Sequence, residues 1–189
     1  MKIPAREYWR KAVHVSGLFF IPVLLWDREV FAALLAAFLA CYLLVEFLAK
    51  RGIALPLLSA LTANSKRDTE RGRFSRGALF LVASGLVTPY LFGPSAAAVG
   101  LTQIFAADVP STLAGMKWGT KKLPYSPRKS WIGSFTYFVT AFAVALPFVP
   151  PPQAAVLALL GAIVESLPLP EADNLTVPLV VGLAAVLMT

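Results

Sequence analysis

The chain has 189 residues, of which 58% are hydrophobic and 14% are charged, whereas a soluble domain of this size has about 25% charged residues. So little polar surface argues against a water-soluble fold and favours one that has the lipid bilayer as its solvent. The net charge of +7 could suit nucleic acid. The basic residues, however, lie in loops between apolar stretches, so we expect no nucleic-acid partner.

Seven apolar stretches predict membrane-spanning helices, because a lone strand in lipid would leave its backbone groups unpaired. In chain order they are 12–26, 30–49, 77–92, 95–116, 131–148, 152–167 and 174–189. The uncharged runs 77–107 and 130–164 are each too long for one crossing, and prolines near their middles divide them into helical hairpins. The predicted fold class is therefore all-α, a polytopic membrane protein that forms a single domain over residues 1–189.

Two further features of these stretches lead to expectations. The segment 53–63 is too short to cross a bilayer, so we expect it to lie at the interface or to re-enter. Cys41, the one cysteine, lies in the second stretch and can form no internal disulfide. We expect it to be a packing residue.

The distribution of charge predicts the orientation. With seven crossings, the N-terminus and the loops 50–76, 117–130 and 168–173 share one side, and they hold 16 of the 17 Lys and Arg residues. Arg28 is the exception. Because basic loops stay in the cytoplasm, we expect an integral membrane protein with a cytoplasmic N-terminus and its active site at the cytoplasmic face.

Acidic residues in or next to apolar spans cost free energy to insert, so they mark candidate functional positions. They are Glu46, Asp108, Glu165 and Asp173. Pro110 is expected to break the helix beside Asp108, which could then face a water-filled cavity and bind Mg²⁺. An ion pair with a nearby lysine or arginine is the structural alternative. Glu165 and Asp173 could add oxygens to the same metal, or Asp173 and Asn174 could cap the last helix.

The loop before the fifth span combines positive charge with hydroxyls and the start of a helix, a combination that suits polyphosphate binding. Its candidate residues are Lys117, Lys121, Lys122, Arg128, Lys129, Ser130, Gly133 and Ser134. The alternative is a basic loop that contacts anionic lipid headgroups. Near the N-terminus, Arg10, Lys11 and His14 share a helix face, where His14 could contact phosphate or transfer a proton. The loop 66–76 is expected to be solvated, or to close over a nucleotide.

Six short motifs follow one another along the chain: Glu7-x-x-Arg10-Lys11-x-x-His14, Arg73-Phe-Ser-Arg-Gly77-Ala, Ala107-Asp108-x-x-Ser-Thr-x-x-Gly115-x-x-Trp-Gly119, Arg128-Lys129-Ser130-x-x-Gly133-Ser134, Val164-Glu165 and Asp173-Asn174-x-x-x-Pro178. With Glu46 after the first of them, they cover nearly the whole chain. In this order they resemble the dolichol kinase, phytol kinase and CTP-dependent diacylglycerol kinase family. These membrane enzymes are distantly related to phosphatidate cytidylyltransferases.

The resemblance implies transfer of the γ-phosphoryl group of a nucleotide, usually CTP, to a membrane lipid alcohol, with Mg²⁺ as cofactor. By motif match, Asp108 and Asp173 would hold the metal or activate the hydroxyl. Lys117, Lys129, Ser130 and Ser134 would contact phosphates. The sequence leaves the lipid open among polyprenol, phytol, geranylgeraniol and diacylglycerol types, and it leaves open CTP against ATP and the oligomeric state.

Two other functions compete with the kinase. The stretch Ser126-Pro-Arg-Lys-Ser-Trp-Ile-Gly133 also resembles part of the cytidylyltransferase signature, which would imply a CDP-lipid synthase. The C-terminal motif at Asp173 favours the kinase, although Ile132 stands where those kinases often have an acidic residue. A small membrane transporter or a structural subunit is the non-enzymatic alternative.

Overall fold

The computed structural model describes residues 3–53, 55, 62, 74–169 and 171–188. Most of the predicted interfacial segment 53–63, and most of the basic loop 66–76, lie outside these ranges. Helices make up most of the described chain, which confirms the predicted all-α class.

The first half of the chain forms a helical hairpin and a third long helix. Its elements are α1 (Ala5–Ser16), the 3-10 turn η1 (Gly17–Phe20), α2 (Ile21–Trp26), α3 (Arg28–Lys50) and α5 (Arg76–Phe92). Asp27 caps α3, because its side chain accepts hydrogen bonds from the backbone N–H groups of Glu29 and Val30 at 2.7 and 2.9 Å. This cap fixes the sharp corner between α2 and α3.

The second half supplies the remaining helices and a short hairpin. They are α6 (Pro94–Thr102), the π-helix η3 (Gln103–Ala107), α7 (Asp108–Trp118), β1 (Lys122–Leu123), β2 (Ser126–Ser130), α8 (Trp131–Ala145), α9 (Pro151–Ser166) and α10 (Asp173–Leu187). Gly93, with φ at 79°, separates α5 from α6. Pro151 starts α9, so both predicted proline breaks fall where the chain turns.

Six of the seven predicted stretches coincide with these helices to within three residues, whereas the first, 12–26, starts seven residues later than the observed helix, which begins at Ala5. Elements α1, η1 and α2 follow one another without a break, as do α6, η3 and α7. Among the helices described, α3 alone, with 23 residues, has both the length and the apolar composition to cross a membrane, while α5, α8, α9 and α10 are apolar and shorter.

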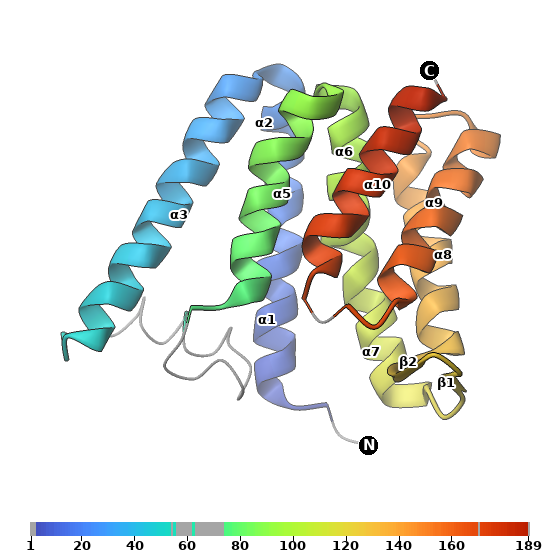
Figure 1. The fold of residues 1–189 in the computed structure, drawn as a ribbon, viewed down its shortest axis with the longest axis horizontal. Helices are drawn as coiled ribbons and strands as arrows, with labels where there is room; N and C mark the ends of the chain where they lie inside the picture. The colour runs from blue at the N-terminus through green and yellow to red at the C-terminus, as the bar shows by residue number, and fades with distance from the viewer. Residues whose placement is uncertain (1–2, 54, 56–61, 63–73, 170, 189) are drawn as a thin grey trace.

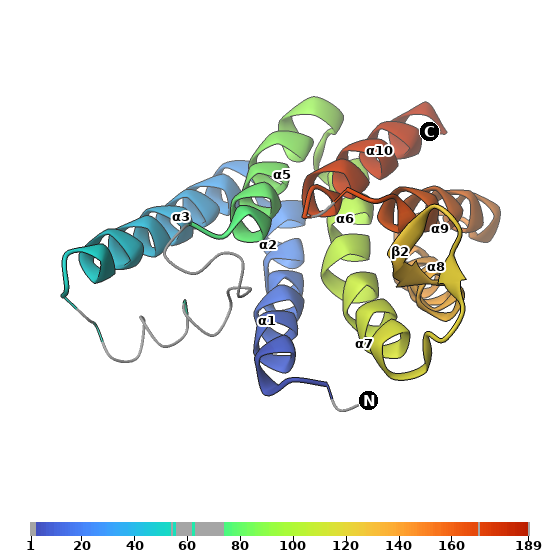
Figure 2. The same ribbon diagram turned by 60° about the horizontal axis from the view of Figure 1, so that its bottom comes forward.

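The core is centred on α6, which α2, α5, α8 and α10 surround (Figures 1 and 2). Small residues let these helices approach closely. A Cβ added to Gly100 of α6 would lie 2.7 Å from the carbonyl oxygen of Pro178 in α10, so the two backbones are in contact there. Helix α3 lies at one edge of the bundle, against α2 and α5.

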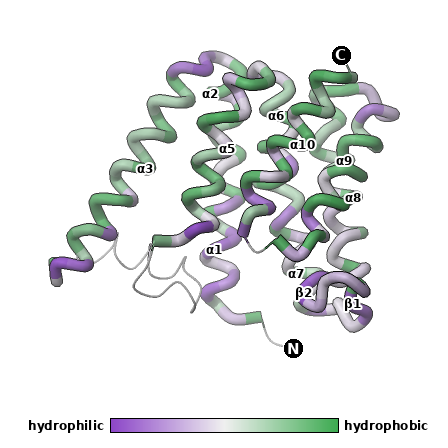
Figure 3. The backbone as a smooth tube through the Cα atoms, in the orientation of Figure 1, coloured by the Kyte–Doolittle hydropathy of each residue, from purple (hydrophilic) through white to green (hydrophobic). Residues whose placement is uncertain are grey.

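Hydrophilic residues gather at the lower end of the bundle, which holds the start of α1, the end of α3 and the β1–β2 hairpin (Figure 3). The α2–α3 corner with Arg28 and the C-terminus lie at the opposite end (Figure 1). The predicted grouping of the N-terminus with the basic loop 117–130 is therefore confirmed as an arrangement of the chain.

Two expectations about local structure were wrong. Pro110 does not break its helix. Instead, the π-helix η3 passes directly into α7 at Asp108, two residues before the proline. Cys41, expected to be a packing residue, is exposed. Within the loop 117–130, β1 and β2 pair as an antiparallel hairpin.

Candidate active site

A cavity of about 1000 Å³ opens near the hydrophilic end of the bundle. Its walls come from α1, α3, α5, α7, the β1–β2 hairpin, the start of α8 and the chain between α9 and α10. The cavity therefore joins segments that are far apart in the sequence. Both Asp108 and the basic loop 117–134 contribute to it.

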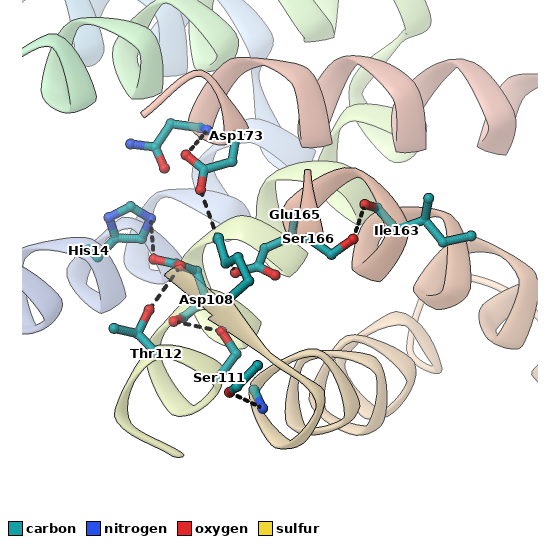
Figure 4. Close-up of polar contacts among 12 residues, drawn as sticks. His14, Asp108, Ser111, Thr112, Ile163, Glu165, Ser166 and Asp173 are labelled. Carbon is teal, nitrogen blue, oxygen red and sulfur yellow. Dashed lines mark hydrogen bonds and ion pairs between the residues drawn. The ribbon is translucent and has the colours of Figure 1, made fainter. Parts of the chain in front are cut away.

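Asp108 is held in the cavity by side chains from two helices. It is 7% exposed, and its carboxylate forms an ion pair with the ammonium group of Lys11 in α1. His14, one turn further along α1, places its Nε2 atom 3.6 Å from Asp108 Oδ2, as Figure 4 shows. Thr112, one turn after Asp108 in α7, donates its hydroxyl to Oδ1 at 3.3 Å. The shared face predicted for Lys11 and His14 thus points at the buried acid.

A second charged group is centred on Lys129 at the end of β2. Its ammonium group pairs with the buried carboxylate of Glu165 at the end of α9 and lies 3.4 Å from Asp173 Oδ2 at the start of α10. Burial alone would lower the pKa of Lys129, but the negative charges of Glu165 and Asp173 outweigh it and raise that pKa above its usual value. Lys129 is therefore a fixed cation between two acids.

The start of α8 is packed tightly against the end of α7. Ser130 caps α8, because its hydroxyl oxygen accepts the N–H of Gly133 at 3.2 Å. A Cβ added to Gly119 would collide with the side chain of Ser130, and one added to Gly133 would lie 3.2 Å from the carbonyl oxygen of Ser111. These glycines keep α7 and α8 close enough for the loop between them to face the cavity.

The structure brings together most of the predicted site residues. Those that line the cavity are Arg10, Lys11, His14, Asp108, Lys117, Lys122, Arg128, Lys129, Ser130, Gly133, Ser134, Glu165, Asp173 and Asn174. Lys121 lies elsewhere, beside Trp131 and Phe135 at a smaller recess, and its backbone carbonyl accepts the N–H of Trp131 at 3.2 Å. Glu46 is buried in α3 and does not border the cavity. The chemical roles of the lining residues stay predictions.

Several polar residues at the site were not predicted from sequence. Thr112 could have been found, because it lies four residues after Asp108 on the same helix face. The Tyr125 and Ser166 hydroxyls, 2.9 Å apart, tie the hairpin to the end of α9, and no sequence pattern links two residues so far apart. Gln103 and Tyr137 do not line the cavity; both are fully buried, and their side-chain polar atoms have no hydrogen-bond partner in the structure.

The three predicted metal ligands fall into two sets, Asp108 on Lys11 and the pair Glu165 and Asp173 on Lys129. Within the described part of the chain, no three His, Cys, Asp or Glu side chains gather as a metal site. Mg²⁺ in phosphoryl-transfer sites uses one or two carboxylates together with substrate phosphates and water. Glu165 and Asp173, which reach one ammonium group, fit that donor set.

Comparisons with known proteins agree on one relationship. The chain is 28% identical to phytol kinase 1, chloroplastic, of Arabidopsis thaliana over 94% of its own length and 65% of that protein. It is 30% identical to a probable phytol kinase, chloroplastic, of Triticum aestivum over 95% of its own length and 66% of that protein. A phytol kinase of Synechocystis sp. is 33% identical over 57% of the chain and 52% of the relative.

The plant relatives are longer proteins, and the chain covers just under two thirds of their length. No family model matches the chain, and no solved structure does. The matches to these plant phytol kinases nevertheless extend over nearly all of this chain. The chain is thus similar to phytol kinases over nearly all of its length, which confirms the predicted resemblance to this kinase family.

Proposed function

We propose that the protein is an integral membrane lipid-alcohol kinase that transfers the γ-phosphoryl group of a nucleotide, CTP, to the hydroxyl of a polyprenol-, phytol- or diacylglycerol-type lipid. One observation carries the proposal. A single cavity combines two buried or partly buried acid–lysine groups and several further cations with a wall of apolar residues. A polyphosphate and a lipid could both reach such a cavity.

The membrane setting is supported by the outer surface of the helices. Large apolar side chains project outward on several of them, with exposed fractions of 81% for Phe19, 79% for Trp26, 63% for Phe135 and 78% for Leu187. Water would disfavour that surface, and lipid would not. The hydrophilic end with the basic loops would then face the cytoplasm.

The basic residues would bind the triphosphate. Lys129 lines the cavity beside Glu165 and Asp173. The same cavity is lined nearer to solvent by Lys117, Lys122 and Arg128. Ser134 has a buried hydroxyl with no hydrogen-bond partner in the structure, so it has a donor to offer a phosphate oxygen. Fixed cations at these positions would neutralise the negative charge of the phosphates and hold them in line for attack.

Asp108 would accept the proton of the lipid hydroxyl. The hydroxyl oxygen then forms a bond to the γ-phosphorus, the bond from that phosphorus to the bridging oxygen breaks, and the nucleoside diphosphate leaves. Lys11 and His14 would hold the Asp108 carboxylate in position through the contacts described above. Mg²⁺, held by Glu165 and Asp173 when bound with the nucleotide, would neutralise further phosphate charge.

The test is transfer of label. The purified protein, in detergent with Mg²⁺ and CTP labelled at the γ-phosphate, should label phytol or another prenyl alcohol. Replacing CTP by ATP in the same assay decides the nucleotide. Release of pyrophosphate with a phosphatidic-acid substrate, and no labelled lipid alcohol, would overturn the kinase in favour of a CDP-lipid synthase. Absence of nucleotide binding would favour a transporter or subunit.

A further inference from the structure

The cavity has an arm that the polar chemistry does not use. It lies between α1, α3 and α5 and is lined there by Val13, Phe38, Cys41, Val45 and Leu81; we call this the apolar arm. The same cavity continues without interruption to Lys11, His14 and Asp108. Its two ends therefore differ sharply in polarity.

The apolar arm reaches the outer surface of the bundle. Phe38 lines the cavity and is still 53% exposed, while Val45, two turns further along α3, lines it and is 3% exposed. Helix α3 diverges from α1 toward the hydrophilic end in both views of the fold (Figures 1 and 2). Residues that both line a cavity and remain exposed mark its mouth, so this mouth opens sideways between helices.

Two polar side chains of α3 near the arm already have partners. The hydroxyl of Tyr42 accepts the backbone N–H of Ser75 at 2.8 Å, which ties the start of α5 to α3. The ammonium group of Lys50 lies 4.2 Å from the centre of the Phe74 ring and strengthens the same join. Among the described residues, the wall of the arm formed by α3 and the start of α5 is thus mainly apolar, which suits a hydrocarbon chain better than a polar ligand.

We infer that the apolar arm holds the hydrocarbon chain of the lipid alcohol, with its hydroxyl directed at Asp108 and its far end leaving between α1 and α3. This inference rests on the proposed function, because it assigns a position to the acceptor of that reaction. The arm leads directly to the acid, because α1 presents Val13 to the arm and His14, the next residue, to Asp108. A chain in the arm would carry its polar end directly to the acid.

Cys41 gives a test that needs no turnover. It is the one cysteine of the chain, it is exposed, and it lines the arm. Phytol added to the detergent-purified protein should slow the reaction of Cys41 with a maleimide at least fivefold. A series of straight-chain alcohols should protect with an affinity that rises by up to about fourfold for each methylene buried, until the arm is full.

A matched control moves the thiol to the outside of the same helix. Leu44 is 55% exposed and does not line the cavity, so the variant with both Cys41→Ser and Leu44→Cys presents a thiol that phytol should leave unprotected. Equal protection at both positions would mean that phytol acts through the micelle, and it would overturn the inference. Unchanged reactivity of Cys41 at saturating phytol would overturn it too.

A second pair of variants tests the position of the lipid without the maleimide reaction. Cys41→Trp should fill the arm and lower kcat/KM for phytol at least tenfold, with a short-chain alcohol changed less than twofold, and Leu44→Trp should change neither. Labelled product without protection of Cys41 would retain the kinase and remove the lipid position. Protection of Cys41 without any labelled product would retain the lipid position and remove the kinase.

Discussion

Replacing Lys129 by methionine removes the positive charge that lies between Glu165 and Asp173 while keeping most of the side-chain volume. Breaking a buried ion pair by removing one partner costs about 3–5 kcal/mol, because the remaining charge stays buried without compensation. Glu165 is 3% exposed, so it has little water to replace the lysine. Its other course is to take up a proton, which costs a glutamate of ordinary pKa about 4 kcal/mol at pH 7. That cost sets an upper limit on the stability lost in Lys129→Met.

We therefore expect Lys129→Met to lower the stability by about 3–4 kcal/mol. In a chain of this size such a loss lowers the midpoint of thermal unfolding by about 6–16 °C. The assay is thermal unfolding of the purified protein in a mild detergent at pH 7, followed by intrinsic fluorescence. Lys129→Arg, which retains the charge, is the matched control and should lie within about 1 kcal/mol of the parent.

A double variant isolates the charge. Adding Glu165→Gln to Lys129→Met removes the uncompensated carboxylate, so most of the lost stability should return, although nucleotide binding should not. If Lys129→Met unfolds at the parent temperature, or if the double variant is no more stable than the single one, the ion pair is not the reason that Glu165 can be buried. Lys129 would then not be the cation that compensates the buried carboxylate of Glu165.

Four other changes test separate parts of the site. Asp108→Asn should reduce phosphoryl transfer at least a hundredfold, measured as kcat with γ-labelled nucleotide. It should also lower the thermal midpoint, because it leaves the buried ammonium group of Lys11 without its carboxylate partner. Gly119→Ala, which forces a Cβ against Ser130, should cost about 1–3 kcal/mol in the same unfolding assay. Because Lys129 has a raised pKa, its stabilising contribution is fully present below its ordinary pKa of 10.5 and is lost only as pH rises through the raised value. Lys129 should therefore stay protonated from about pH 6 to pH 9. Nucleotide affinity, measured by titration over that range, should have the same pH dependence in the parent protein and in Lys129→Arg. Chelation of divalent ions by EDTA should abolish labelling of the lipid, and added Mg²⁺ should restore it.

The helices could be predicted closely because their signals are local. Runs without charge fix each apolar stretch, and the prolines and glycines at 89–94 and 147–152 fix the turns between them. The acid–lysine groups could be predicted only as members of one site. Loop charge placed Asp108, Lys129 and Asp173 at one end of the bundle, but the pairing of Lys11 with Asp108 joins residues 97 positions apart and follows from packing.

The misses have physical reasons as well. The position of Cys41 in an apolar run suggested burial in protein, yet an apolar residue can equally face lipid or an open cavity, and periodicity does not separate these settings. Pro110 suggested a break, whereas the change to a π-helix just before Asp108 absorbs the loss of a backbone donor. Lys121 was counted by charge alone, and the β1–β2 hairpin turns its side chain away from the cavity.

Because of the π-helix Gln103–Ala107, the position of Asp108 in the site depends on the number of residues in the helix before it. A π turn contains about one residue more than an α turn, so it shifts everything after it by about 100° around the axis. Two contacts fix the rotation of the helix about its axis: Gly100 packs against Pro178 before the π-helix, and Asp108 pairs with Lys11 after it. Deleting one residue between them would let a regular α-helix form and would swing the acid away from its lysine. Among homologous chains, a gap of one residue in this stretch would therefore mark a protein that has moved its acid or lost its activity.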